Sequence, residues 1–194
     1  MKQKLQAKDF ITVGVFTAIM FVVCMAVSML GFIPVFIPLL SVLVPIISGI
    51  PFMLFATKAQ KFGMVTLMGV LMGLIMGFMG HGIWAFVAGP LFGLLSDLVM
   101  RSGNYKSAKK DTIASGVFFL TIIGNYLPIV LARAAYYDQL VETGYGAEYA
   151  DALMKMIPDW SLLPLGIASF VCGMLGALLG RAILKKHFVR AGIV

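Results

Sequence analysis

Long apolar runs alternate with short polar connections along the 194-residue chain. Each run is close to the roughly 20 residues that a helix needs to cross the hydrocarbon core of a bilayer. The expected helices cover residues 10–30, 37–57, 63–79, 83–100, 112–132 and 161–185. We therefore expect an all-α integral membrane protein, in which residues 1–194 form a single domain of six transmembrane helices.

The connection before the last run, residues 133–160, is the one long polar segment of the sequence. Within it, residues 147–157 place apolar side chains at helical spacing, at Leu153, Met154 and Ile157. We expect a short amphipathic helix there, lying on the membrane surface.

Composition supports a membrane location. The chain is 61% hydrophobic and 12% charged, whereas a soluble domain carries about 25% charged residues. The first apolar run follows Lys2 and Lys4 and has no small-residue cleavage site, which favours a retained helix over a signal peptide. Cys24 and Cys172 lie inside apolar runs without zinc or redox spacing, as is typical of packing residues.

Basic residues divide the connections into two sets. All but two of the 15 lysines and arginines, Arg133 and Lys155, fall on one side of a six-helix chain. Cytoplasmic connections carry this excess in membrane proteins, so both termini are expected in the cytoplasm. The outer side then receives residues 31–36, the turn at 80–82 and the acidic segment 134–160. The positions of the basic residues are thus more informative than the net charge of +7, and we expect no nucleic-acid partner.

His81 is the most conspicuous polar group of the apolar region, because it stands between Gly80 and Gly82 at the end of a helix. The glycines would let a flat ligand approach the backbone, and Trp84 adds an aromatic face, so His81 and Trp84 are candidate substrate-binding residues. A neutral imidazole also suits a metal centre held in a macrocycle such as haem. The alternative is an ordinary interfacial histidine with a tryptophan anchor. No second histidine or thiolate lies nearby in sequence, which disfavours a bare transition-metal site.

A second polar set lies on the outer half of the fifth helix and consists of Asn125, Tyr126 and Arg133. These three are also candidate substrate-binding residues. Arg133 could pair with a ligand carboxylate. Alternatively, it extends to the outer surface and pairs with Asp138.

Two features inside the apolar runs bear on packing. Pro45 and Pro51 interrupt the second helix and free main-chain carbonyls, so this helix should face protein or a cavity rather than lipid. At the inner end of the fourth helix, Asp97 and Arg101 have the spacing of a local ion pair.

Small residues at four-residue spacing recur on several helices, and such faces let helix backbones approach closely in lipid. Gly69, Gly73 and Gly77 are expected to pack helices together. Gly14 and Ala18 lie toward the cytoplasmic end of the first helix, so their face is the candidate for docking another membrane protein. Packing inside the bundle is the alternative for that face too.

Catalytic patterns are absent from the sequence, which has no Gly-x-Ser-x-Gly, HExxH, P-loop or pair of inward carboxylates. We therefore expect no enzymatic activity and no intrinsic cofactor. Six helices are also few for a secondary transporter built from inverted repeats.

Short stretches along nearly the whole chain carry a family resemblance. They are AKDFITVGVFTA (7–18), PIISGIPFMLF (45–55), GHGIW (80–84), GAEYADALM (146–154), PDW (158–160) and GALLGRAILKKHF (176–188). With its length, helix number and long outer segment, the chain resembles the substrate-binding S components of energy-coupling factor (ECF) transporters. More closely, it is similar to the Trep_Strep family of bacterial integral membrane proteins, which belong with that group.

The resemblance implies a mechanism. An S component binds a micronutrient in an outward-facing pocket, docks on a transmembrane T component through its first helix, and topples in the bilayer to release substrate inward. Two ATPase subunits drive the cycle. Gly14 and Ala18 match the alanine-rich docking motif, with glycine in place of the first alanine. Residues 31–36 and 134–160 would be the pocket lids, and the protein would lie in the plasma membrane of a bacterium.

Haem, cobalamin or another vitamin-like molecule are the candidate substrates. The outer mouth offers His81, Trp84 and other apolar groups with few charges, which favours a large, flat, partly apolar ligand. Our hypothesis is haem, with His81 as its axial ligand. The competing interpretations are a non-transport membrane scaffold and an intramembrane enzyme.

Overall fold

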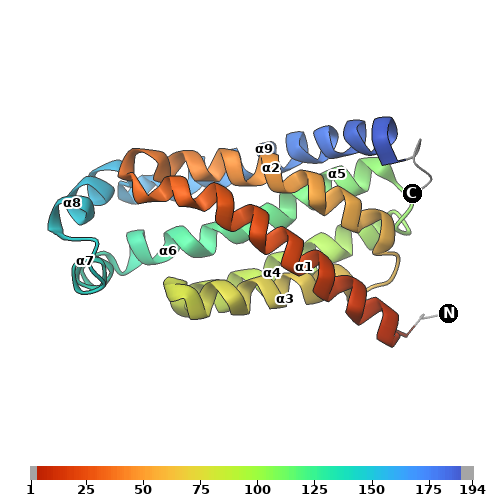
Figure 1. Ribbon diagram of the computed structural model, residues 1–194, viewed down its shortest axis with the longest axis horizontal. Helices are drawn as coiled ribbons and strands as arrows, with labels where there is room; N and C mark the ends of the chain where they lie inside the picture. The colour runs from red at the N-terminus through yellow and green to blue at the C-terminus, as the bar shows by residue number, and fades with distance from the viewer. Residues whose placement is uncertain (1–3, 189–194) are drawn as a thin grey trace.

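The computed structural model describes residues 4–188, and every regular element within that range is helical. The helices of the bundle are α1 (Ala7–Ser28), α2 (Ile37–Lys58), α3 (Met64–Met76), α4 (Gly82–Ser102), α5 (Ala108–Phe119), α6 (Ile123–Leu131) and α9 (Leu162–Ile183). Two further helices, α7 (Arg133–Glu142) and α8 (Ala147–Met156), lie at one end of the bundle (Figure 1). Single helical turns cover Met29–Phe32, Pro34–Phe36, Gly77–His81, Leu120–Ile122, Asp159–Ser161 and Leu184–Phe188.

Five helical stretches are long and apolar enough to cross a membrane. One of them, Met64–Ser102, is 39 residues long and folds back on itself, so α3 and α4 lie antiparallel (Figure 1). A second, Ala108–Leu131, joins α5 and α6 into one rod. Within the described residues the chain therefore forms six membrane-crossing rods, and the prediction of an all-α membrane protein is confirmed.

The sharp turn between α3 and α4 depends on two glycines. Gly80 has a φ of 106° and Gly82 a φ of 61°, in the region that only glycine occupies without strain. The turn holds His81 between them, at the outer tip of the α3–α4 pair.

Glycines bring the helices close together in the membrane region. A Cβ at Gly69 would lie 2.4 Å from the Gly89 carbonyl oxygen, and a Cβ at Gly89 would lie 2.6 Å from the Gly73 Cα. Helices α2 and α9 meet in the same way at Gly176, where a Cβ would lie 2.4 Å from the Pro45 carbonyl oxygen. Close backbone approach of this kind is a main source of helix association in lipid. The packing interpretation of the α3 glycine ladder is therefore confirmed.

Pro45 explains why α2 lies inside the bundle. Proline has no N–H to bond to the carbonyl one turn earlier, which here belongs to Ser41. The Ser169 hydroxyl of α9 donates to that carbonyl at an oxygen–oxygen distance of 3.1 Å. Because a freed carbonyl in lipid needs a protein partner, the proline-containing helix packs against α1, α5 and α9 as expected.

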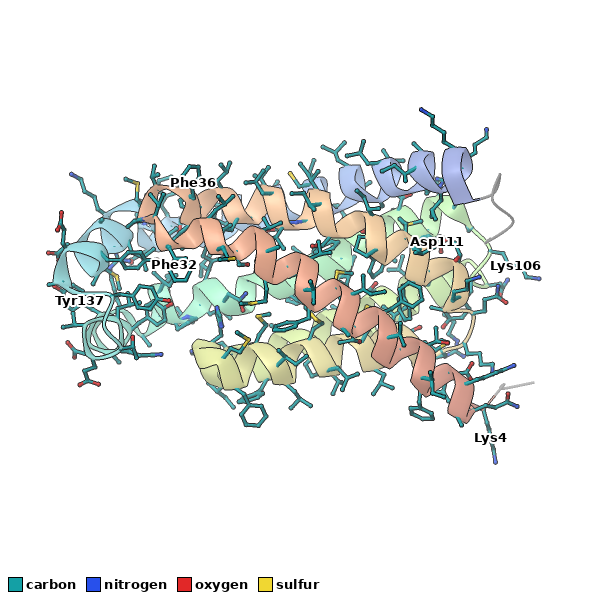
Figure 2. The ribbon with its side chains drawn as sticks, viewed as in Figure 1. Lys4, Phe32, Phe36, Lys106, Asp111 and Tyr137 are labelled. Atoms are coloured by element: carbon teal, nitrogen blue, oxygen red, sulfur yellow. The ribbon has the colours of Figure 1, made fainter. Side chains whose placement is uncertain are left out.

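The two ends of the bundle differ in chemistry. Figure 2 places Lys4 and Lys106 at one end and Phe32 and Tyr137 at the other. The α2–α3 and α4–α5 connections lie at the first end, together with the start of α1 and the end of α9 (Figure 1). The excess of lysine and arginine assigns that end to the cytoplasm. Helices α7 and α8 are therefore on the outer side.

The environment of Asp97 differs from the sequence-based expectation. Within residues 4–188 no ion pair joins it to Arg101. The carboxylate is fully buried and accepts hydrogen bonds from the main-chain N–H groups of Gly63 and Thr66. Those donors belong to the beginning of α3, where a helix has unsatisfied N–H groups. The prediction of a local ion pair is therefore wrong, because Asp97 caps the beginning of a neighbouring helix, α3, instead.

Candidate binding site at the outer end

Helices α7 and α8 form a cap over the outer end, which we call the outer cap (residues 133–156). Two hydrogen bonds tie it to the two outer turns of the bundle. The Tyr149 hydroxyl donates to the Gly31 carbonyl at 2.6 Å, and the Gln139 side-chain amide donates to the Gly80 carbonyl at 3.3 Å. The outer cap thus reaches the turn that carries His81. Sequence analysis anticipated a short helix at residues 147–157 but not α7, which lies in the polar part of the segment.

Aromatic rings add to the contact between the outer cap and the first outer turn. Phe32 stacks on Tyr145 with ring centroids 6.4 Å apart, and Tyr145 lies 4.9 Å from Tyr149. Burial raises the pKa of Tyr149 to about 12, so its hydroxyl remains protonated and able to donate at physiological pH. Burial also raises the pKa of Tyr136, which neighbours Tyr145.

Arg133 holds the outer cap together from within. Its guanidinium donates to the Ile157 carbonyl at 2.8 Å and to the Met154 carbonyl, and it pairs with Asp159 at 3.1 Å. A cation at the end of a helix satisfies free carbonyls and complements the helix dipole. Arg133 therefore caps the end of α8, and its ionic partner is Asp159 rather than Asp138, the alternative that the sequence offered.

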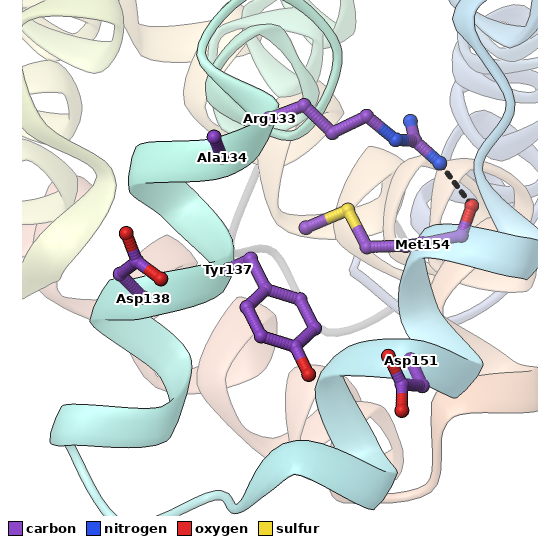
Figure 3. Close-up of a pocket in the computed structure, with 6 residues that line it drawn as sticks. All are labelled: Arg133, Ala134, Tyr137, Asp138, Asp151 and Met154. Carbon is purple, nitrogen blue, oxygen red and sulfur yellow. Dashed lines mark hydrogen bonds between the residues drawn. The ribbon is translucent and has the colours of Figure 1, made fainter.

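An open depression of about 490 Å³ lies between α7 and α8 (Figure 3). Its lining residues are Arg133, Ala134, Tyr137, Asp138, Asp151 and Met154. Figure 3 shows the Arg133 guanidinium bonded to the Met154 carbonyl and the Tyr137 hydroxyl directed toward Asp151. The depression belongs to the outer cap itself, and none of His81, Trp84 and Asn125 lines it.

His81 is partly buried at the tip of the α3–α4 pair. Its Nδ1 lies 3.2 Å from the Met76 carbonyl oxygen. When Nδ1 carries the proton for that bond, the lone pair of Nε2 is left free for a ligand. The backbone beside the ring is also open: a Cβ at Gly82 would meet no atom within 4 Å, and one at Gly80 would meet only the Gln139 amide nitrogen, at 3.7 Å.

Trp84 and Asn125 lie on adjacent helices near His81. Helix α6 approaches α4 at Gly124, where a Cβ would lie 3.1 Å from the Trp84 carbonyl oxygen and 2.6 Å from the Ala88 Cβ. Trp84 is one helical turn beyond His81, and Asn125 directly follows this close contact. Both side chains are partly buried. Among the residues that the structure describes, none forms a hydrogen bond with the Asn125 amide, which leaves it available to a ligand.

Tyr126 points away from these groups. Its side chain is 3% exposed, and its hydroxyl donates to the Ile37 carbonyl at 2.6 Å. The bond joins α6 to the beginning of α2. Of the five sequence-predicted binding residues, the structure therefore brings His81, Trp84 and Asn125 to one region, and gives Tyr126 and Arg133 bonds within the protein.

The face of α1 that carries Gly14 and Ala18 is open. Both residues are exposed, and a Cβ at Gly14 would meet no atom within 4 Å. The opposite face of α1 buries Val13, Thr17 and Met20 against the bundle. Gly14 thus differs from Gly69, Gly89 and Gly176, which lie against neighbouring backbones.

No cluster of three or more histidine, cysteine or carboxylate side chains able to hold a metal ion occurs in residues 4–188. His81 could contribute a single ligand to a metal that arrives already bound in a macrocycle.

The residues that fasten the outer cap could not be identified from the sequence. Gln139 and Tyr149 bond to carbonyls more than fifty residues away in the chain, and no local pattern reports such a partner. The aromatic content of the polar segment, at Tyr136, Tyr145 and Tyr149, was the available signal. Aromatic side chains in a polar connection often mark a packed surface.

A model for a family described as hypothetical bacterial integral membrane proteins (Trep_Strep) matches residues 7–190. The chain belongs to the Trep_Strep family. Comparisons with curated proteins and with solved structures found no match. Membership in Trep_Strep, together with the apolar helices, identifies a multi-pass bacterial membrane protein.

Proposed function

We propose that this Trep_Strep protein is the substrate-binding S component of an ECF-type importer. In this role it captures a micronutrient at the outer face and delivers it by toppling against a T component, with two ATPase subunits driving the cycle. The observation that carries the proposal is the unpartnered small-residue face of α1 at Gly14 and Ala18.

The argument for docking is a contrast between glycines. In lipid, helices associate where small residues let backbones approach. Gly69, Gly89 and Gly176 already lie against other backbones of the same chain. Gly14 has the same chemistry but no neighbour, so its face is suited to a helix of a second membrane protein.

The outer end supports capture of a ligand. The outer cap is fastened to the outer turns by side-chain hydrogen bonds to the Gly31 and Gly80 carbonyls. The bond from Gln139 to Gly80 can be released without disturbing the helix packing below, because it involves none of the interhelical glycine contacts. An outward-facing binding subunit needs a cap that can open over its ligand contacts.

The proposed substrate is haem, cobalamin or another vitamin-like molecule, with haem as the leading hypothesis. Three features support a flat, partly apolar ligand: the free Nε2 of His81, the open backbone at Gly82, and the aromatic side chain of Trp84 on the same helix. Asn125 supplies an unpaired amide from α6. Charged groups near these residues are few, which disfavours a small polyanionic ligand.

The alternatives are a membrane scaffold and an intramembrane enzyme. An enzyme would need two polar side chains that act together at membrane depth. In the described structure the His81 ring bonds to a main-chain carbonyl, that of Met76, and not to another side chain. A scaffold would need neither a docking face for an ATPase-linked partner nor a releasable outer cap.

Co-purification and uptake distinguish these functions. The tagged protein should co-purify with a T component and two ATPase subunits, identified by mass spectrometry. Gly14→Leu should abolish both complex formation and substrate uptake while leaving the isolated protein folded. Ala26→Leu is a matched control, because Ala26 is also small and exposed on α1 but lies toward the outer end. If no complex co-purifies and Gly14→Leu leaves substrate uptake unchanged, the scaffold interpretation is favoured.

Haem titration of the detergent-purified protein tests the substrate. We expect a shift of the Soret band that is lost or altered in His81→Ala. A shift that is identical in His81→Ala would exclude His81 as the axial ligand. Absence of any shift, with cobalamin binding in a parallel titration, would replace haem by cobalamin without affecting the docking proposal.

A further inference from the structure

A second cavity, of about 540 Å³, opens at the cytoplasmic end between α2, α5 and α9. It lies at the opposite end of the bundle from His81 and the outer cap. Figure 2 shows Asp111, one of its lining residues, at the same end as Lys4 and Lys106. The proposed capture of substrate makes no use of this cavity.

The lining has an apolar part and a cationic part. Met53 and Leu184 are buried apolar side chains, whereas Leu178 is 49% exposed and faces outward from α9. Arg181 and Lys185 follow on the same helical rod, four residues apart, and both line the cavity. Residues at this spacing lie on one face of a helix. The cavity therefore places two cations beside apolar surface at the level of the membrane boundary.

The polar groups of the cavity are incompletely bonded. Within the described residues, Arg181 makes one hydrogen bond, of 3.4 Å, to the Ala108 carbonyl, although a guanidinium has five N–H donors. Asp111 also lines the cavity, and its buried Oδ1 has no hydrogen-bond partner in the structure described. No ion pair within 4 Å joins Asp111 to Arg181 in residues 4–188. A buried polar group without a partner is costly, which indicates a missing donor near Oδ1.

We propose that this cavity binds the headgroup of an anionic phospholipid that carries hydroxyl groups, as phosphatidylglycerol does. The phosphate lies between Arg181 and Lys185, a headgroup hydroxyl donates to Asp111 Oδ1, and an acyl chain follows the exposed Leu178. Basic pockets between transmembrane helices at the cytoplasmic face are suited to anionic lipid headgroups. The apolar wall distinguishes a lipid from a free phosphate, which would gain nothing from it.

Thermal stabilisation of the full-length protein in detergent tests the proposal, with phosphatidylglycerol, phosphatidylcholine and free glycerol phosphate as probes. Phosphatidylglycerol should stabilise the protein saturably and the other two should not. The double variant Arg181→Gln, Lys185→Gln should weaken the apparent affinity about thirtyfold, because each cation beside an anionic lipid contributes roughly a factor of five. The matched control Lys106→Gln, Lys109→Gln removes the same charge from the same end outside the cavity. It should change the affinity by less than about twofold.

Several results would overturn the proposal. Equal stabilisation by glycerol phosphate would indicate a free-phosphate site, and equal stabilisation by phosphatidylcholine would indicate general solvation by lipid. An equal loss in the two double variants would indicate diffuse electrostatics.

If the Arg181 and Lys185 double variant does not fold, Asp111→Ala provides an independent measurement. The wild-type protein should prefer phosphatidylglycerol to phosphatidic acid, which lacks the glycerol hydroxyls, and Asp111→Ala should bring the affinity ratio close to one. An unchanged ratio would refute the assigned contact.

Discussion

Replacing Asp97 with alanine removes the carboxylate that joins the cytoplasmic ends of α3 and α4. Oδ2 accepts bonds from the Gly63 N–H at 2.8 Å, the Thr66 N–H at 3.0 Å and the Thr66 hydroxyl at 2.9 Å, and Oδ1 accepts from the Tyr105 hydroxyl at 2.8 Å. Burial and the hydrogen bond to Asp97 raise the pKa of Tyr105 well above its usual range. The tyrosine therefore stays protonated and donating at any physiological pH.

The expected loss follows from these four bonds. Loss of a helix N-cap costs about 1 kcal/mol, and each of the two hydroxyls left without an acceptor costs about 1 kcal/mol more. Asp97→Ala should therefore lower the free energy of unfolding by about 3 kcal/mol. Asp97→Asn should cost only about 1 kcal/mol. Its amide oxygen can replace Oδ2, and its amide nitrogen can donate to the Tyr105 oxygen.

Unfolding in mixed detergent and dodecyl sulfate micelles, followed by circular dichroism, measures these differences. Asp138→Ala is the control, because Asp138 is an exposed carboxylate of the outer cap and its removal should change stability by less than about 0.5 kcal/mol. Equal losses in Asp97→Ala and Asp97→Asn would refute the assigned bonding pattern. A loss in Asp97→Ala no larger than that in Asp138→Ala would show that the capping contact does not stabilise the fold.

Two further predictions concern glycine and tyrosine. Gly89→Ala should lower the free energy of unfolding by about 2 kcal/mol, because its Cβ would overlap the backbone of α3, whereas Gly14→Ala should change it by less than about 0.5 kcal/mol. The same unfolding assay compares them, and equal losses would contradict the open α1 face. Tyr126→Phe should cost about 1 kcal/mol through loss of the bond to Ile37. Ligand affinity measured on the folded variant should be unchanged, and a selective loss of affinity would return Tyr126 to the binding site.

The helices could be predicted because their signals are local. A few neighbouring residues are enough to recognise membrane-crossing length, the Gly-His-Gly turn at residues 80–82 and the small-residue faces. Proline in α2 likewise predicted a helix that needs protein neighbours, and the Ser169 bond supplies one.

The polar contacts could not be predicted, because their partners are distant in sequence. Asp97 bonds to residues more than thirty positions earlier. Local spacing therefore predicted the wrong partner for it, Arg101. Arg133 bonds to the end of α8 more than twenty positions later. In both cases the side chain completes the end of another helix, a role that depends on how the helices meet rather than on local spacing.

The outer cap has a strong half and a weak half, and this asymmetry bears on access to His81. Helix α8 is anchored by the buried side chains of Leu153 and, just beyond its end, Ile157, so separating it from the bundle would expose much apolar surface. The bonds from Arg133 fasten the first residue of α7 to the end of α8. Beyond Arg133, helix α7 buries Leu140 fully, half-buries Tyr136 and Tyr137, and bonds to the turn through Gln139. Releasing residues 134–142 while Arg133 keeps its bonds to α8 costs about 2 kcal/mol for the leucine, about 1 kcal/mol for each half-buried tyrosine and about 1 kcal/mol for the hydrogen bond. A state about 5 kcal/mol above the closed one is populated at roughly 0.02%, and a ligand that binds it about 10⁴-fold more tightly would make it the main state. Because Gln139 bonds to Gly80, beside His81, the half of the cap that opens most easily is the half that covers the proposed ligand contact.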